Sequence, residues 1–424
     1  MTSASVLTLA LFGVVFLLVQ QGRVDRQQAM LGGAGAFLVL GWLMGFYPIR
    51  EAIGSIYFDT LALIFGMSLI ADLLSRSGFF RYLAFRTAWF SRGNPVLTMV
   101  LFVLVTYTVS LVVNNLGAML ILLPLTVACC QLLEIDAAPI VAAELIASNL
   151  GGASTLVGDF PNMIIGAAAN LHFGDFIGGM MVPCLLLLAV LLLFFRRQMA
   201  FISGSVGRDQ QAVALFFQQQ AGKMVIVDPR RLRIGMTILI LTLVGFLLAE
   251  VIGVRPATVA FVAGLVVLGL GHIPARELFK AISGGDILFF FGLFVMVGGL
   301  QAAGVLEQLH QLMLVLGGGY ATLSLLVLMW TAGVVTPFLN AGPATAFLIP
   351  VAEAMSRDFS SSNVWWALSL GVLAGSSATL SGATAGPIVA SQSTLDFQRY
   401  LQWGVPMAVG FLSLSTVYIV LIGA

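Results

Sequence analysis

Charged residues are scarce in this 424-residue chain, and their scarcity excludes most soluble proteins. Asp, Glu, Lys and Arg make up 9% of the residues, whereas a soluble domain has about 25%. The 19 Lys and Arg against 18 Asp and Glu leave a formal net charge of +1, so no basic stripe is available to bind nucleic acid. Apolar residues account for 60% of the chain, which excludes an intrinsically disordered protein.

Cysteine is scarce as well, and its positions exclude a disulfide framework. Cys129, Cys130 and Cys184 all fall in apolar segments, and their spacing matches neither a metal site nor a disulfide scaffold. A cleavable signal peptide is not expected, because the first apolar run, 6–19, has no basic residues before it and no small-residue cleavage site after it. This run is therefore predicted to be the first membrane span.

Long apolar runs are what the chain has in abundance. The mean hydropathy is +1.06, and many runs approach the ~20 residues that a helix needs to cross a bilayer. They fall near residues 5–20, 29–48, 57–75, 94–133, 139–171, 177–195, 233–253, 256–272, 286–302, 318–356, 363–393 and 401–423. The sequence therefore predicts an all-α polytopic membrane protein.

Four of these runs are too long for one straight span. The runs 94–133 and 318–356 are each about two helices long and are interrupted only by short uncharged turns, which predicts two helical hairpins that each start and end on the same side of the membrane, either re-entrant or fully spanning. The runs 139–171 and 363–393 are broken by Gly, Ser, Thr and Pro, which predicts two broken helices that each cross the membrane once. Ten crossings then remain, five in each half.

The basic residues divide unevenly between the two faces of this arrangement. Sixteen fall on one side, and only Arg50, Arg255 and Arg357 fall on the other. Lys and Arg concentrate on the cytoplasmic side of membrane proteins. The sequence therefore predicts that both termini face away from the cytoplasm.

The second half of the chain repeats the first at an offset of 226 residues. This offset pairs Pro48, Arg50, Glu51, Gly66, Gly78, Asn114 and Pro124 with Pro274, Arg276, Glu277, Gly292, Gly304, Asn340 and Pro350. In the broken runs the offset falls to 224, where it pairs Thr155, Leu156 and Gly158 with Thr379, Leu380 and Gly382. Because each half has an odd number of crossings, the second repeat is predicted to have inverted topology, which is common among secondary transporters.

The predicted organisation follows from this repeat. The first inverted repeat occupies 1–197 and the second 233–424, each with one hairpin and one broken helix. Between them, 198–232 is rich in glutamine and carries four of the basic residues, Arg208, Lys223, Arg230 and Arg231. We expect this linker to be a cytoplasmic surface segment.

The breaks and the hairpin tips are where a ligand is expected to bind. Non-helical backbone at membrane depth is tolerated only where protein or a water-filled cavity supplies hydrogen-bond partners, and inverted-repeat transporters bind their ligands there. The candidate ligand-binding residues are Asn114, Asn115, Ser148, Asn149, Ser154, Thr155, Asp159, Asn162, Asn340, Ser376, Ser377, Thr379, Ser381 and Thr384.

Two carboxylates are candidates for proton coupling. Asp159 is predicted at mid-membrane, and Glu144 lies one to two turns inside the same span; such groups carry protons or bind cations. The alternatives are that Asp159 only caps the helix begun by Pro161 and that Glu144 is solvated at the membrane surface. A sodium ion is expected at Asn114, Asn149 and Asp159, if sodium is the coupling ion.

Other polar residues have plainer interpretations. All Lys and Arg lie in loops or near helix ends, so no buried basic group is expected to bind an anion. The hairpin-tip asparagines are alternatively simple turn formers. His172, His272 and His310 are predicted to lie in surface loops.

At these residues the chain resembles the ion transporter superfamily, in the branch of arsenite permeases, NhaD-type sodium/proton antiporters and the melanosomal P protein. The resemblance covers essentially the full length and includes 58–67 (FDTLALIFGM) and 77–80 (SGFF). Its most specific part is 147–162 (ASNLGGASTLVGDFPN), which looks like the family's S-N-x-G-G-x-x-T-L-x-G-D-x-P-N signature. The resemblance implies two re-entrant hairpins, two broken spans, a site between the hairpin tips and the breaks, and elevator-like alternating access.

The chain also departs from this family pattern. Many relatives carry Asp-Asn at each hairpin tip, where this chain has Asn114-Asn115 and Asn340-Ala341. The final Asn that is frequent in the second break is Gly386 here. These changes leave Asp159 as the single obvious proton or cation carrier.

The sequence thus predicts a secondary transporter in which a proton or sodium gradient drives antiport of a small cation. Efflux of arsenite or another small anion or oxyacid is the alternative within transport, and a passive ion channel is the alternative of another class. No enzyme activity is expected, because no nucleophile has a base within reach, and no cofactor is expected beyond H⁺ or Na⁺. The expected location is the bacterial inner membrane or an internal membrane derived from it, and a homodimer is left open.

Overall fold

The computed structural model describes residues 3–22, 24–92, 94–203 and 228–422, and every regular element in these ranges is a helix. Most of the predicted linker 198–232 lies outside the described residues.

The first half contains eleven α-helices or short helical segments and one π-helical turn. They are α1 (Ser3–Gln21), α2 (Arg26–Met44), α3 (Ile49–Gly54), α4 (Phe58–Arg76), α5 (Phe79–Phe90), α6 (Pro95–Ser110), α7 (Asn115–Leu133), α8 (Ala138–Ala153), α9 (Phe160–Ala169), α10 (Phe173–Phe176), the turn η1 (Ile177–Met181) and α11 (Val182–Ser203). The expected hairpin 94–133 holds α6 and α7, and the expected broken helix 139–171 holds α8 and α9.

The second half follows the same order. It contains α13 (Pro229–Ile252), α14 (Pro256–Leu270), α15 (Ala275–Ala281), α16 (Gly284–Ala302), α17 (Val305–Leu316), α18 (Ala321–Leu339), α19 (Ala341–Phe359), α20 (Asn363–Ala378), α21 (Gly386–Gln392) and α22 (Phe397–Ile422). The starts of α4, α5, α6 and α7, at residues 58, 79, 95 and 115, each precede those of α16, α17, α18 and α19 by 226 residues.

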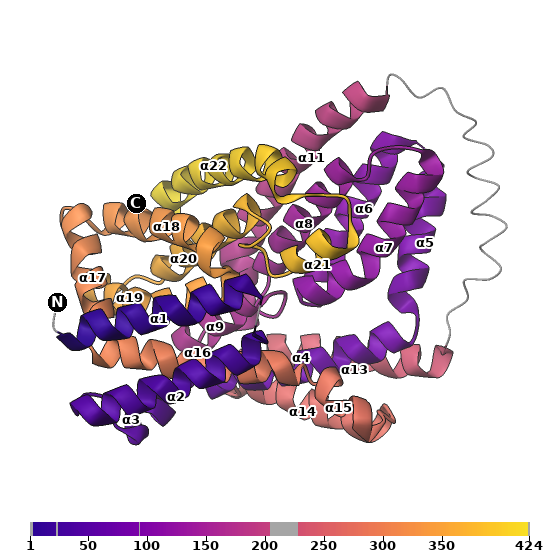
Figure 1. The fold of residues 1–424 in the computed structure, drawn as a ribbon. Helices are drawn as coiled ribbons and strands as arrows, with labels where there is room; N and C mark the ends of the chain where they lie inside the picture. Colours follow the sequence, from indigo (N-terminus) through magenta and orange to yellow (C-terminus); the bar gives the residue numbers. More distant parts are fainter. Residues whose placement is uncertain (1–2, 23, 93, 204–227, 423–424) are drawn as a thin grey trace.

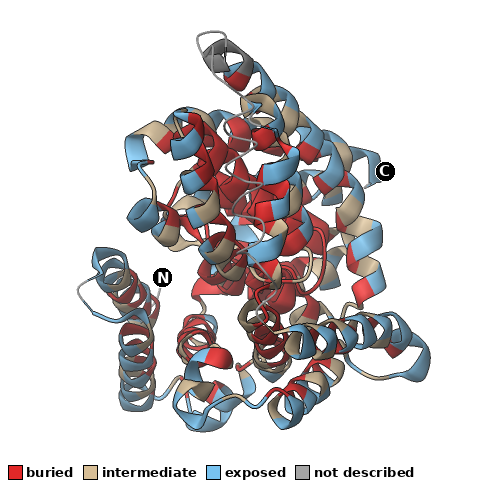
Figure 2. Ribbon diagram, turned by 90° about the vertical axis from the view of Figure 1, so that its right-hand side faces the viewer, coloured by how far each residue is buried: buried red, intermediate tan, exposed pale blue. Residues whose placement is uncertain are grey.

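The helices are those of a membrane protein. Within the described residues, nine helices are long and apolar enough to cross a bilayer, and five further apolar helices are shorter. The longer helices run in roughly one direction, whereas α17 at one end of the molecule and α5 at the other run across it (Figure 1). Peripheral helices expose apolar outer faces, and the buried residues gather in the middle of the bundle (Figure 2).

The two halves pack against each other through glycines. α4 packs against α14, and α16 packs against α2. A Cβ atom at Gly66 would lie 1.9 Å from the carbonyl oxygen of Ala260, and one at Gly292 would lie 2.7 Å from that of Met30. The absence of a side chain therefore lets these helix backbones come into contact, which gives a physical reason for the paired glycines in the sequence.

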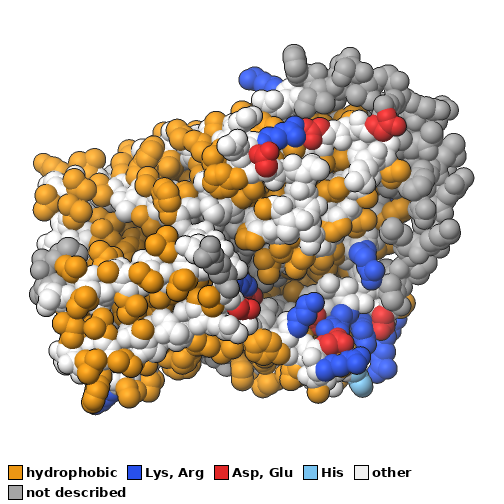
Figure 3. Space-filling model, in the orientation of Figure 1, with side chains coloured by type: hydrophobic (Ala, Val, Ile, Leu, Met, Phe, Trp, Pro, Cys, Tyr) orange, Lys and Arg blue, Asp and Glu red, His pale blue; other side chains and the backbone are white. Residues whose placement is uncertain are grey.

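Two ion pairs lie at the same two helix contacts. Arg26 of α2 lies 2.5 Å from Asp286 of α16, and Arg255, which precedes α14, lies 3.0 Å from Asp59 of α4. On the visible face most side chains are apolar, and the basic ones lie mainly towards the end that carries α5 and α15 (Figure 3). Each half of the chain thus contributes an arginine that pairs with the other half.

Three expectations about individual elements were wrong. α5 and α17 were not predicted, because each is only 12 residues long and carries charged or polar residues in its apolar pattern. His310 is not in a surface loop: it lies in α17, is 5% exposed, and its Nε2 is 2.8 Å from Asp358 of α19. His172 and His272 do lie between helices, as expected.

Candidate functional site

Each broken helix contains a stretch of non-helical chain beside a hairpin tip. α8 ends at Ala153 and α9 begins at Phe160, while α20 ends at Ala378 and α21 begins at Gly386. Every residue of α8 is buried. The glycines of the first break allow close contact: a Cβ at Gly158 would lie 2.5 Å from the carbonyl oxygen of Ser110 in the hairpin.

Asp159 lies at the end of the first break and uses its two oxygens differently. Its Oδ1 accepts a hydrogen bond from the backbone N–H of Phe160 at 2.9 Å, so that it caps α9. Its Oδ2 accepts from the Nδ2 of Asn115 at 2.8 Å. The side chain of Asp159 is 6% exposed, so this carboxylate is a helix cap and also a buried group that faces the hairpin tip.

Asn115 joins the hairpin tip to both parts of the broken helix. Besides Asp159, its Nδ2 donates to Oδ1 of Asn149 at 3.2 Å. Its own Oδ1 is buried and has no hydrogen-bond partner among the described residues. An amide oxygen of this kind normally has a partner when buried, so this atom is available to a ligand.

Asn149 extends the cluster to the second half of the chain. Its Nδ2 donates to the carbonyl oxygen of Ser376 at 3.1 Å and lies 3.5 Å from the hydroxyl of Ser377. Thr384 of the second break lies 3.5 Å from Oδ1 of Asp159. Residues from both halves therefore meet around one carboxylate.

Asn162 supports the shape of the first break. Its Nδ2 lies within hydrogen-bond distance of the carbonyl oxygens of Gly152, Ala153 and Thr155, at 2.8 to 3.3 Å. Its Oδ1 accepts from the hydroxyl of Ser369 in α20 at 2.9 Å. Asn162 therefore satisfies backbone carbonyls that the end of α8 leaves free.

The second hairpin tip contacts the second break through Asn340. The Nδ2 of Asn340 donates to the carbonyl oxygens of Ser381 and Ala383 at 3.0 and 3.1 Å, and the N–H of Ala341 donates to Gly382 at 3.0 Å. Asn340 has φ 76° and ψ 157°, a conformation that strongly favours glycine. The hydrogen bonds at this tip hold the strained backbone in place.

The remaining candidates mostly bond to the protein itself. Hydroxyls of Thr155, Thr379 and Ser381 donate to hairpin carbonyls, Ser154 pairs with Tyr107, and those of Ser148, Ser376 and Ser377 donate to carbonyls in their own helices. Asn114 caps α7, because its Oδ1 accepts from the N–H of Gly117 at 2.8 Å. Among the two tip asparagines it is therefore Asn115, and not Asn114, that contacts Asp159.

A small cavity adjoins this cluster. It has about 10 Å³ of space for the centre of a water molecule and is lined by Asn149, Asp159, Asn162, Ala341, Ser369 and Ser376, among others. About one water or one small ion fits such a space. In the part of the chain that the structure describes, no ion pair involves Asp159.

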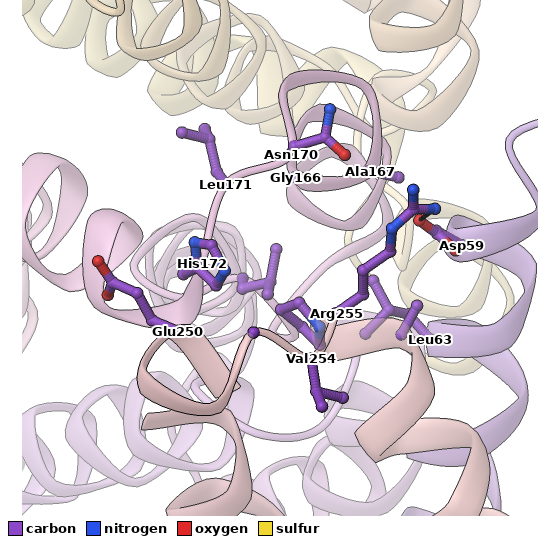
Figure 4. A pocket seen from close by; sticks show the side chains of 14 residues that line it. Asp59, Leu63, Gly166, Ala167, Asn170, Leu171, His172, Glu250, Val254 and Arg255 are labelled. Atoms are coloured by element: carbon purple, nitrogen blue, oxygen red, sulfur yellow. Dashed lines mark hydrogen bonds and ion pairs between the residues drawn. The ribbon is translucent and has the colours of Figure 1, made fainter. Parts of the chain in front are cut away.

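A larger cavity of about 230 Å³ lies between α4, α9 and the turn that joins α13 to α14. Arg255 reaches towards Asp59 at its edge, and His172 and Glu250 lie on its other side (Figure 4). Leu156 of the first break also lines this cavity. Its side chain packs on Gly166, because a Cβ atom at Gly166 would lie 2.2 Å from the Leu156 side chain. Gly166 follows Phe160 by six residues, about 9 Å along a helix, and no described residue lines both this cavity and the small one beside Asp159.

Glu144 is not a solvated carboxylate at the membrane surface, which was one of the two alternatives predicted for it. It is 0% exposed. Its Oε1 accepts hydrogen bonds from the hydroxyls of Thr106 and Thr126, at 3.1 and 3.0 Å. No sequence signal marks these two threonines as partners of Glu144, because isolated threonines in apolar helices carry no distinctive pattern.

A metal centre built from side-chain clusters is not present in the described ranges, where no three His, Cys, Asp or Glu residues gather. A cation at the Asp159 cluster would instead be held by one carboxylate, amide oxygens and backbone carbonyls. Such oxygen ligands suit hard cations.

Known proteins match the chain over nearly its whole length. It is 42% identical to the magnetosome protein MamN of Magnetospirillum gryphiswaldense, over 97% of this chain and 98% of that protein. It is 28% identical to an uncharacterized transporter of Mycobacterium bovis, over 98% of both chains. Its fold is similar to that of the YdaH transporter of Alcanivorax borkumensis, with a TM-score of 0.63 and 14% identity over 94% of this chain and 98% of that one.

A family model matches the chain as well. The model for CitMHS, described as "Citrate transporter", matches residues 14–371. The predicted membership of the ion transporter superfamily is thereby confirmed, and the protein is an integral membrane secondary transporter and not an enzyme. The chain belongs to the citrate transporter (CitMHS) family.

Proposed function

We propose that this protein is a cation-coupled secondary transporter in which the carboxylate of Asp159 binds a proton and a small cation such as sodium in alternation. The observation that carries this proposal is the pairing of Asp159 with Asn115. That amide donates to one oxygen of Asp159 and leaves its own buried Oδ1 without a partner. A carboxylate and an unpaired amide oxygen together are ligands for a cation.

The chemistry around Asp159 favours a cation over an anion. The amide oxygens of Asn115 and Asn149 belong to the same hydrogen-bonded cluster as the Asp159 carboxylate. No Lys or Arg of the described residues pairs with that carboxylate. A buried negative charge without a partner is costly. A proton or a cation neutralises it, and both cannot occupy the same oxygens at once.

We further propose that the protein works by alternating access between two inverted repeats. The 226-residue interval between equivalent helix starts supports this organisation. The contacts between the two halves, in which α4 packs on α14 and α16 packs on α2, also support this organisation. The hairpins and broken helices would move as one unit past these helices, with the site at their centre.

Transport of a small organic anion is the second candidate. The name of the family model, citrate transporter, favours it. Because Asp159 repels an anion, such a substrate would need the bound cation beside it. The proposed cation site is therefore common to both candidates, whereas a passive channel would need no coupled site.

The name of one relative bears on the membrane in which the protein works. A relative at 42% identity is named a magnetosome protein. We propose the bacterial inner membrane, or an internal membrane derived from it, with both termini on the non-cytoplasmic side.

Flux measurements in proteoliposomes test the proposal. With an imposed pH gradient, the wild type should take up radioactive sodium against its gradient, and Asp159→Asn should lose this coupled uptake. Glu51→Gln, at an exposed position in α3, is the matched control and should keep it. Sodium uptake that ignores the pH gradient, or that persists in Asp159→Asn, would contradict the proposal.

A further inference from the structure

A second buried carboxylate lies in the same broken helix, away from the Asp159 cluster. Glu144 of α8 is 0% exposed. Hydroxyls of Thr106 in α6 and Thr126 in α7 both lie within hydrogen-bond distance of its Oε1. Its Oε2 is buried and has no partner among the described residues. Three helices of the hairpin and the broken helix therefore converge on one acidic group.

No positive charge balances this group. In the described residues, no Lys, Arg or His forms an ion pair or hydrogen bond with Glu144. The titratable groups that face it are Cys129 and Cys130 of α7. Tyr107 and Cys184 face Ser154 at the other end of α8.

Two opposing effects act on the proton of Glu144. Burial without a counter-charge favours the neutral acid, whereas hydroxyl donors on Oε1 favour the carboxylate. A group under such opposed influences can release and bind a proton as its surroundings change, and small movements of α6 or α7 would change the number of its donors.

The second half of the chain shows whether the fold itself needs Glu144 and its two threonines. At the offsets of 226 and 224 residues, Thr106, Thr126 and Glu144 correspond to Ala332, Ala352 and Leu368. All three counterparts are fully buried, and α18 packs against α20 as α6 packs against α8. The same arrangement of helices thus forms with three apolar residues, so the fold does not require the polar set.

We propose that Glu144 is a second proton-binding site of this transporter, separate from Asp159. In one state the side chain is a neutral acid with its proton on Oε2, and in the other it is a carboxylate whose Oε1 accepts from Thr106 and Thr126. The proton passes to and from water, and no other reactant is needed. The role of this proton in coupling rests on the proposed function, but the existence of the site does not.

Infrared difference spectroscopy of the purified full-length protein tests this site without any transport substrate. Between about pH 6 and about pH 9, exposed carboxyls are already ionised, so carboxyl bands in the difference spectrum report buried acids. The Glu144→Gln variant should lose one such band and keep that of Asp159, and Asp159→Asn should show the reverse. Glu51→Gln, the exposed control, should give the wild-type spectrum.

The outcomes separate this inference from the proposed function. A Glu144→Gln spectrum identical to the wild type would overturn the inference. Loss of the Glu144 band together with unaltered sodium coupling in Asp159→Asn would support the inference and contradict the proposed function. If Glu144→Gln does not fold, the double variant Thr106→Val/Thr126→Val keeps the acid but removes its donors. Its Glu144 band should then persist to higher pH, and an unchanged band would overturn the inference.

Discussion

At the scale of the residue, the two oxygens of Asp159 have different partners. One oxygen caps α9 and the other meets Asn115. The cap orients the carboxylate, because an N–H donor fixes one oxygen and leaves the other towards the hairpin tip. In the proposed function, this helix cap also positions the carboxylate that binds the cation.

The two neighbouring tip asparagines should respond differently to mutation. Asn115→Ala removes the amide that contacts Asp159, a hydrogen bond to a charged group worth about 2 kcal/mol, and should weaken sodium binding roughly 10- to 100-fold. Asn114→Ala removes only the α7 cap, at a cost of about 1 kcal/mol of stability. Sodium affinity by calorimetry and thermal melting distinguish the two. Equal loss of affinity in both variants would contradict the assignment.

How far single residues could be predicted depended on their surroundings. The signature around Asp159 marked the break correctly, because Pro161 and the glycines have strong local preferences. The burial of Glu144 and His310 could not be predicted, because burial depends on which helices pack around a residue. Asn114 and Asn115 are adjacent in sequence, and only the helix start at Asn115 determines which side chain faces the break.

At the scale of the element, each hairpin tip contacts a break, but the two tips do so differently. The first uses a side chain, Asn115, at the start of α7. The second uses Asn340, which lies between α18 and α19 in a strained conformation. At the position equivalent to Asn115 the second half has Ala341, so its contact with the break is made through backbone and through Asn340.

The strain at Asn340 gives a prediction opposite to ordinary helix preferences. Asn340→Gly loses two hydrogen bonds of about 1 kcal/mol each but accepts the positive φ. Asn340→Ala loses the same bonds and adds backbone strain of about 1–3 kcal/mol. The alanine variant should therefore melt at the lower temperature. If the alanine variant is at least as stable as the glycine variant, the backbone at residue 340 is not strained and the prediction is wrong.

The contact between α4 and α14 should tolerate no side chain at Gly66. A Cβ there would overlap the backbone of Ala260 at 1.9 Å, so Gly66→Ala should destabilise the protein by about 1–3 kcal/mol. Gly35 in α2 has open space around it, and Gly35→Ala should be neutral or stabilising by up to about 1 kcal/mol. Thermal unfolding in detergent checks both, and equal effects would contradict the close packing.

Elements were predicted well where composition marks them. The ranges expected for hairpins and broken helices coincide with the helix pairs α6–α7, α8–α9, α18–α19 and α20–α21. The short helices α5 and α17 were missed, although Gly78 and Gly304 were paired in the repeat. Both glycines have positive φ and directly precede these helices, so the repeated glycine was the signal of a repeated helix start.

At the scale of the whole molecule, the two halves share an arrangement of helices but differ in chemistry. Asn115, Asn149, Asp159 and Asn162 correspond to Ala341, Leu373, Ala383 and Gly386. Both buried carboxylates of the broken helices thus belong to the first half. The proposed cation site therefore has no counterpart in the second half, in line with the departures from the family pattern that the sequence already shows.

The inverted repeat predicts where equivalent residues lie relative to the membrane. Arg50 and Arg276 are related by the 226-residue offset and are both exposed. The three native cysteines are buried, so they give little background to thiol labelling. Arg50→Cys should react with an impermeant reagent from the non-cytoplasmic face and Arg276→Cys from the cytoplasmic face. Labelling of both from one face would exclude inverted topology.

If a proton and a cation compete for Asp159, sodium binding must displace the proton, and proton release on sodium binding reports this competition. Sodium should be added to the purified protein in weakly buffered detergent solution, with a pH-sensitive dye as the readout. Because cation binding requires the ionised carboxylate, the wild type should release protons at a pH where Asp159 is protonated, with sodium affinity rising as pH rises. Asp159→Asn should release none. Sodium binding without proton release in the wild type at every pH, or equal release in Asp159→Asn, would contradict the account.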